Sequence, residues 1–90
     1  MTTISLSGTV DPVRALALKR QLTELCATDR PRIHIDLRAV DDLHLSGVNS
    51  IVRALVDARA RAGDLTIAAP ASGPVRRVLR LTGLEGTLES

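Results

Sequence analysis

The order of apolar and polar residues predicts short strands separated by helices. Apolar and polar side chains alternate over residues 3–7, 33–37 and 65–69, a period of two that is typical of strands with one buried face. Gly8 permits a tight turn after the first of these runs. We therefore expect residues 9–10 to form a second short strand beside it, which brings the number of strands to about four.

Three other segments carry apolar residues at helical spacing, namely 12–26, 48–62 and 74–82. The predicted order of elements is β-β-α-β-α-β-α. Strands that are separated by helices pair in parallel through right-handed crossovers. The first strand, which is followed directly by another, is expected to form an antiparallel edge.

Residues at the predicted helix ends support these boundaries. Asp11 and Pro12 suit the N-cap and the first helical position of the first helix. Gly63 is expected to end the second helix in the left-handed conformation. Gly83 followed by Leu84 predicts a Schellman ending for the third helix, with Leu84 returning to the core.

Together these elements predict an α/β fold. Each of the three main strands keeps one polar or small-residue face, which favours helices packed chiefly on one side of the sheet. The expected architecture is a mixed, mostly parallel sheet of about four strands, with residues 1–90 forming a single domain. A chain of 90 residues suits one compact domain.

Composition narrows the classes of function. The chain has 44% hydrophobic residues but no Phe, Tyr or Trp, so its core must be aliphatic and it lacks the rings on which single-stranded nucleic acids stack. The net charge of only +2 also argues against binding to nucleic acid. No apolar run is long enough to span a membrane and no signal peptide is recognisable, so we expect a cytoplasmic protein with no membrane contact. The lone Cys26 lies on an apolar helix face and is expected to be a buried, inert thiol.

Ser46 and Gly47 lie where the loop after the strand at 33–37 gives way to the second helix. The Ser46 hydroxyl could cap that helix by accepting a bond from the backbone N–H near Asn49. It could also be a modification site, because a phosphate is stabilised at a helix N-terminus. A nucleophile is not expected, since the G-x-S-x-G pattern is absent and the positions of His34 and His44 predict no catalytic triad. The sequence therefore predicts a protein that is not an enzyme.

Side chains of the kind that bind metals occur close together in the sequence: His34, Asp36, Asp41, Asp42 and His44. His34 and Asp36 share a strand face, whereas Asp41 and Asp42 are expected in a loop as solvated carboxylates. We therefore expect no metal site, and no motif indicates another cofactor. The arginines of the run "RRVLR" are expected on a solvated helix face.

One long motif carries a resemblance to a known family. The segment "IDLRAVDDLHLSGVNSIVRAL" resembles the central motif of STAS domains, which typically reads Asp-Leu-Ser-x-Val and, a few residues later, Asp-Ser-Ser-Gly-Leu. The opening "LSGTVD" and the later "LTGL" are also similar to segments of that family, so the likeness covers nearly all of the chain. The residues that match the central motif are Asp36, Leu37, Val40, Ser46, Gly47 and Val48.

The resemblance implies an anti-sigma factor antagonist that acts by partner switching. Such an antagonist binds an anti-sigma factor that is also a serine protein kinase, and it is released when the kinase phosphorylates the serine before the motif glycine. That serine corresponds to Ser46, and a serine phosphatase would reset the system. We expect a bacterial protein that is a monomer or weak dimer.

Partner contact is expected around the start of the second helix, at His44, Leu45, Ser46, Gly47, Val48 and Asn49. Leu45 either joins this contact surface or turns into the core. The chain departs from the family pattern at His44, where Asp is usual, and at Leu45, where Ser or Thr is usual. The alternative function is a STAS interaction module that is not switched, such as a stressosome-like or transporter-associated subunit.

Overall fold

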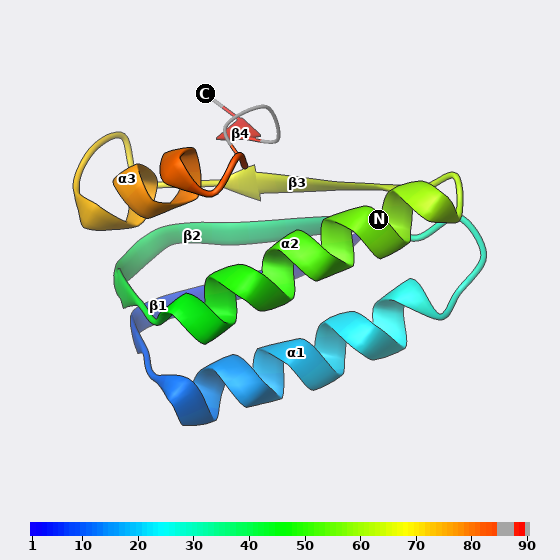
Figure 1. Ribbon diagram of the computed structural model, residues 1–90, viewed down its shortest axis with the longest axis horizontal. Coiled ribbons are helices and arrows are strands. Elements are labelled where there is room, and N and C mark those ends of the chain that lie inside the picture. The colour runs from blue at the N-terminus through cyan, green and yellow to red at the C-terminus, as the bar shows by residue number, and fades with distance from the viewer. Residues whose placement is uncertain (85–87, 90) are drawn as a thin grey trace.

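A computed structural model of the protein describes residues 1–84 and 88–89, so residues 85–87 and 90 of the expected domain lie outside the described residues. The helices and strands follow one another in strict alternation (Figure 1). Their bounds are β1 (Thr2–Val10), α1 (Pro12–Cys26), β2 (Arg32–Leu43), α2 (Leu45–Ala60), β3 (Asp64–Ala68), α3 (Pro74–Leu81) and β4 (Leu88–Glu89).

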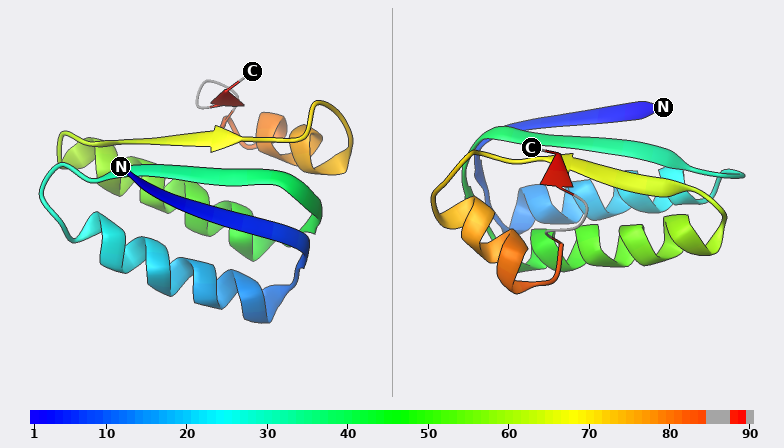
Figure 2. Two further views of the ribbon diagram at one scale, coloured as in Figure 1. Left: turned by 180° about the vertical axis from the view of Figure 1, so that it is seen from behind. Right: turned by 90° about the horizontal axis from the view of Figure 1, so that it is seen from above.

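The strands form one sheet in the order β1-β2-β3-β4. The helices α1, α2 and α3 all lie on one face of this sheet, as the right-hand view of Figure 2 shows. The predicted α/β class, with helices on one face of a mostly parallel sheet, is confirmed. The antiparallel edge is wrong, because β1 pairs with β2 in parallel, as do the other neighbours. A helix follows each of the first three strands and returns the chain to the same end of the sheet, so every strand runs in the same direction.

The strand expected at residues 9–10 is not a separate element. β1 continues to Val10, and Gly8 takes a φ of 68° inside it. The register with β2 shifts between Gly8 and Thr9, so this glycine accommodates an irregularity of the strand instead of a turn. The sheet thus has three long strands, and its fourth strand is the two-residue β4.

β2 is longer than the alternating pattern predicts. It extends to Leu43, because Thr9 and Val10 of β1 pair with Asp42 and Leu43. Asp41 and Asp42 therefore belong to a strand, and the loop predicted there is wrong. As a result β2 leads almost directly into α2, with only His44 between them.

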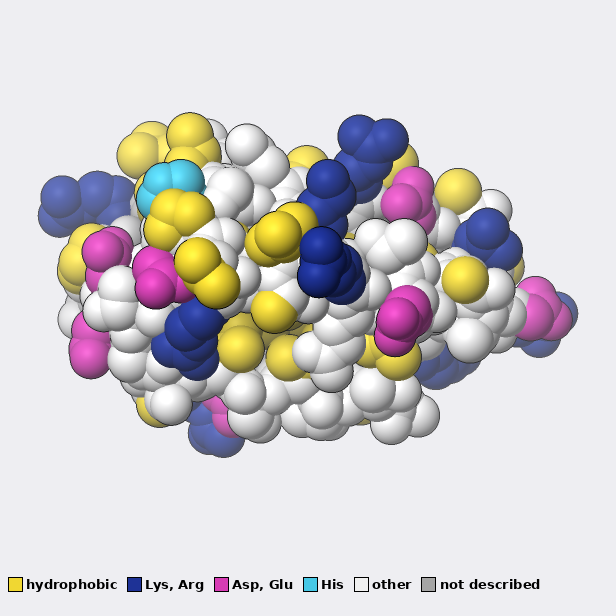
Figure 3. Space-filling model, turned by 90° about the horizontal axis from the view of Figure 1, so that it is seen from below, with side chains coloured by type: hydrophobic (Ala, Val, Ile, Leu, Met, Phe, Trp, Pro, Cys, Tyr) yellow, Lys and Arg dark blue, Asp and Glu magenta, His cyan; other side chains and the backbone are white. Residues whose placement is uncertain are grey.

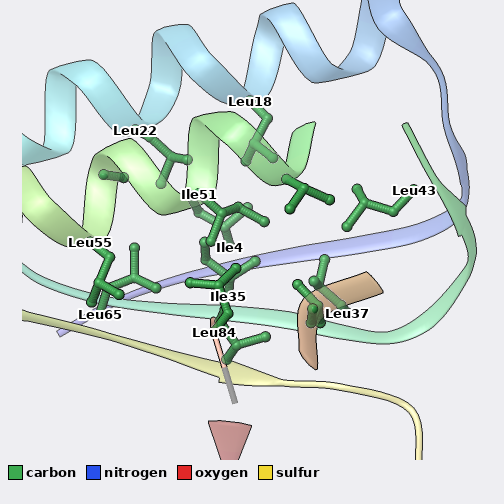
Figure 4. Packing of buried hydrophobic residues seen from close by; sticks show 14 of the residues in the cluster. Ile4, Leu18, Leu22, Ile35, Leu37, Leu43, Ile51, Leu55, Leu65 and Leu84 are labelled. Atoms are coloured by element: carbon green, nitrogen blue, oxygen red, sulfur yellow. The ribbon is translucent and has the colours of Figure 1, made fainter. Parts of the chain in front are cut away.

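The core is aliphatic and lies between the sheet and the helices (Figure 4). Leu22 of α1 and Ile51 of α2 point toward Ile35 of β2, and all three are almost fully buried. Cys26 is also buried, as expected, and its thiol donates a hydrogen bond to the Ala54 carbonyl at 3.5 Å. Burial raises the pKa of this thiol above its ordinary value, which disfavours the reactive thiolate.

Two of the three predicted helix ends are confirmed. Asp11 caps α1, since its Oδ1 accepts a bond from the backbone N–H of Arg14 at 2.8 Å. α3 ends in a Schellman motif, in which Gly83 has a φ of 80° and the Leu84 N–H donates to the Leu79 carbonyl at 3.0 Å. Leu84 is buried, as this motif requires.

The predicted role of Gly63 at the end of α2 is wrong. Ala62 takes the left-handed conformation, with a φ of 60°, and the Gly63 N–H closes the motif on the Ala58 carbonyl at 2.8 Å. Gly63 is needed for space: a Cβ there would lie 2.0 Å from the carbonyl oxygen of Pro31. The glycine therefore permits a close approach of two backbone segments.

Candidate functional site

The start of α2 is held firmly at the carboxyl edge of the sheet. The His44 N–H donates to the Val10 carbonyl at 2.9 Å, which ties the residue before α2 to the end of β1. Gly47 is buried, and a Cβ on it would come within 3.0 Å of Leu43 Cδ1. Val48 is fully buried beside it. The first turn of α2 therefore has one face fixed in the core and the other open to solvent.

His44, and not Ser46, is the N-cap of α2. His44 has an extended backbone, and its Nδ1 accepts a hydrogen bond from the Ser46 N–H at 3.1 Å. The helix therefore begins at Leu45, and Ser46 already lies in its first turn. The predicted cap by Ser46 is wrong, because the helix begins before Ser46 and the His44 imidazole accepts the Ser46 N–H as its side-chain cap.

The Ser46 hydroxyl is oriented by the same imidazole, since its Oγ lies 2.7 Å from His44 Nδ1. A nitrogen that accepts from the backbone N–H carries a lone pair and no proton, so the Ser46 hydroxyl is the donor in this contact. Its oxygen stays exposed, at the positive end of the α2 dipole. An added negative group at this oxygen would be favoured by the helix.

The six residues expected to contact a partner fall into two groups. Gly47 and Val48 are buried, so neither presents a side chain to a partner. The side chain of Leu45 is 57% exposed and does not turn into the core. The exposed group, at the start of α2, consists of His44, Leu45, Ser46 and Asn49.

The residues considered as metal ligands are not brought together. The Nδ1 of His34 contacts the Thr66 hydroxyl at 2.8 Å on the uncovered face of the sheet. Asp36 forms an ion pair with Arg38 at 2.9 Å, and hydrogen bonds from the Arg38 side chain, then from its backbone N–H, lower the pKa of Asp36 to about 2. Among residues 1–84 and 88–89, no three His, Cys, Asp or Glu side chains are grouped so as to hold a metal ion.

A groove between α1 and α2 was not anticipated from the sequence. It has a volume of about 920 Å³, extends from Ser46 along both helices, and includes the exposed apolar side chains of Leu16 and Val56. Figure 3 shows hydrophobic side chains gathered on the underside of the molecule, with basic side chains beside them. The sequence carried one indication of this groove: Leu16 of α1 and Val56 of α2 are apolar residues that lie outside the buried face of their helix.

We predict that His44→Ala lowers the free energy of unfolding by about 1 kcal/mol, because it removes the N-cap of α2. His44→Asp should keep native stability, since a carboxylate both accepts from the Ser46 N–H and faces the positive end of the helix. Urea denaturation of both variants measures the effect. Native stability of the alanine variant would show that the imidazole does not support the helix.

Comparisons with known proteins agree on one family. A family model described as "Mlab, STAS domain" matches residues 1–89. The structure of the anti-sigma factor antagonist SpoIIAA in its unphosphorylated form is similar with a TM-score of 0.84 and 22% identity, over 98% of this chain and 77% of that one. An anti-sigma factor antagonist from Mycobacterium paratuberculosis is similar with a TM-score of 0.75 and 32% identity, over 96% of this chain and 72% of that one. No curated protein sequence gives a significant match.

Proposed function

This chain belongs to the STAS domain family, and we propose that it is an anti-sigma factor antagonist regulated at Ser46. In its unmodified form it binds an anti-sigma factor that is also a serine kinase. Phosphorylation of Ser46 by that kinase releases the complex, and a phosphatase restores the binding form. The protein acts by binding and not by catalysis.

The observation that carries this proposal is the setting of Ser46. The hydroxyl is exposed at the start of a rigidly held helix and is oriented by His44 at 2.7 Å. Leu45, an exposed apolar residue, lies next to it. The 32% identity to the mycobacterial anti-sigma factor antagonist supports the same general role for this chain.

Charge at Ser46 would affect the complex more than the domain. A phosphate adds about −1.5 to −2 charges at pH 7. In the free protein that charge meets the positive end of α2 and open solvent, so the fold tolerates it. In a complex it would have to be desolvated against a surface that fits a neutral hydroxyl, which is costly.

We predict that Leu45→Asp weakens binding to the anti-sigma factor by tenfold or more without lowering the melting temperature. The side chain is 57% exposed, so the fold does not depend on it, whereas a contact surface would lose an apolar anchor and gain a charge. Calorimetric titration against the purified anti-sigma factor measures the change.

Leu81→Asp is the matched control for this variant, because Leu81 is a leucine on α3 that is 77% exposed. It should bind as tightly as the unsubstituted protein. Equal affinity of the two variants would show that partner contact does not involve Leu45.

A second candidate function is a STAS interaction module that binds through this surface without being switched. One observation favours it: the motif has His44 where Asp is usual and Leu45 where Ser or Thr is usual. The two functions differ in one measurable property, which is whether a partner kinase transfers phosphate to Ser46.

A further inference from the structure

The groove between α1 and α2 has an apolar lining that the fold itself does not explain. Leu16 is 49% exposed and Val56 is 61% exposed, one on each wall. Neither contributes to the core cluster. Pro12 and Ala15 extend the apolar lining toward the Ser46 end. Exposed apolar side chains that gather in one concave surface are typical of interaction sites.

The charges around the groove are mostly positive. Lys19 of α1 and Arg53 of α2 line it, against the single carboxylate of Asp57. Neither cation is in an ion pair within residues 1–84 and 88–89. α1 and α2 both begin at the Ser46 end, since each follows a parallel strand, so both helix dipoles add positive potential there.

We propose that this groove binds one amphipathic helix of the partner protein, with acidic residues beside its apolar stripe. The inference rests on the proposed function, because the helix in the groove belongs to the same partner protein that contacts Ser46. The apolar stripe packs between Leu16 and Val56, and the acidic residues face Lys19 and Arg53.

The length of the groove suits such a helix. The lining residues of α2 extend from Ser46 to Asp57, which corresponds to about 16 Å or three helical turns at 1.5 Å per residue. A helix of that length presents apolar anchors at positions i, i+3 or i+4, and i+7, which is the usual arrangement for binding in a groove.

Continuity with Ser46 gives the groove a role in release. Ser46 lies at one end of it, and the acidic helix would bind next to this hydroxyl. A phosphate on Ser46 would repel the acidic residues of the partner helix that lie at this end of the groove. Phosphorylation would then disrupt the apolar contact along with the contact at Leu45.

Photo-crosslinking tests the occupant directly. Benzoylphenylalanine is placed at Leu16, at Val56 or at Leu45 of the full chain in cells that make the protein, and crosslinked peptides are sequenced by mass spectrometry. We expect Leu16 and Val56 to capture one segment, with an apolar repeat of helical spacing and flanking acidic residues. Leu45, which is exposed at the start of α2 and does not line the groove, should capture the same protein at another position.

The outcomes distinguish failure of the proposed binding in the groove from failure of the proposed function. Capture at Leu45 alone overturns the groove and leaves the proposed function standing, as does capture of a second copy of this chain at Leu16 and Val56. Capture of an acidic amphipathic helix from a protein that is not an anti-sigma factor supports the groove and overturns the proposed function. Absence of capture at all three positions overturns both.

A charge-reversal experiment measures how much Lys19 and Arg53 contribute to the affinity for the partner. The double variant Lys19→Glu/Arg53→Glu should bind the captured protein at least tenfold more weakly. Arg77→Glu, which changes an exposed arginine of α3 outside the groove, is the control and should leave affinity unchanged. An unchanged affinity for the double variant would contradict the acidic character of the occupant.

Discussion

Ser46→Asp is expected to weaken binding to the anti-sigma factor by about a hundredfold, or roughly 2.8 kcal/mol. The carboxylate places a charge at the centre of the proposed contact surface, where it must lose water without gaining a partner. Ser46→Ala, which removes the hydroxyl but adds no charge, should bind nearly as well as the unsubstituted protein. Calorimetric titration of the two variants against the same partner measures the difference.

The same aspartate should not harm the fold. It lies in the first turn of α2, where a negative charge is stabilised by about 0.3–1 kcal/mol. The melting temperature of Ser46→Asp should therefore equal or slightly exceed that of Ser46→Ala. Equal affinity of the two variants for the partner would reject a charge-operated switch and leave Ser46 as an ordinary exposed residue.

Gly63→Ala should be among the most destabilising single substitutions in the protein, at about 2–4 kcal/mol. The new Cβ would lie 2.0 Å from the Pro31 carbonyl oxygen and 2.7 Å from its backbone nitrogen. That carbonyl also accepts the Asp64 N–H at 2.9 Å, so the backbone cannot move away without losing this bond at the start of β3. Urea denaturation followed by circular dichroism measures the loss.

Ala62→Gly is the matched variant for this prediction. Ala62 has a φ of 60°, a conformation that costs a residue with a side chain about 1–2 kcal/mol. The substitution should therefore stabilise the protein, in contrast to the change at the next residue. If Gly63 were the left-handed residue instead, Gly63→Ala would cost only about 1–2 kcal/mol and Ala62→Gly would bring no gain.

The contrast between Ala62 and Gly63 shows where prediction from sequence reached its limit. Local rules identified the cap at Asp11 and the Schellman ending at Gly83 because each depends on neighbouring residues alone. A glycine is needed at position 63 because the backbone of Pro31, which is distant in sequence, lies too close for a side chain. A close approach between two segments has no local signature, so the pattern pointed to the wrong role.

The same limit applies to the sheet and to the site. Alternation located the three long strands, but the pairing that carries β2 through Asp41 and Asp42 is made with β1 and could not be read from β2 itself. The resemblance to the STAS motif identified Ser46 as the candidate site. The role of His44 as cap and the groove beside it depend on side-chain directions and on the packing of α1 against α2, which periodicity does not specify.

The most direct test of the account is phosphate transfer to Ser46. The purified protein is incubated with ATP and the proposed partner, an anti-sigma factor kinase, and the intact mass of the protein is recorded together with the site of modification. We predict the addition of one phosphate on Ser46, none on the Ser46→Ala variant, and loss of the complex as modification proceeds. A stable complex with no added mass would contradict the switch and support the module that binds without being switched.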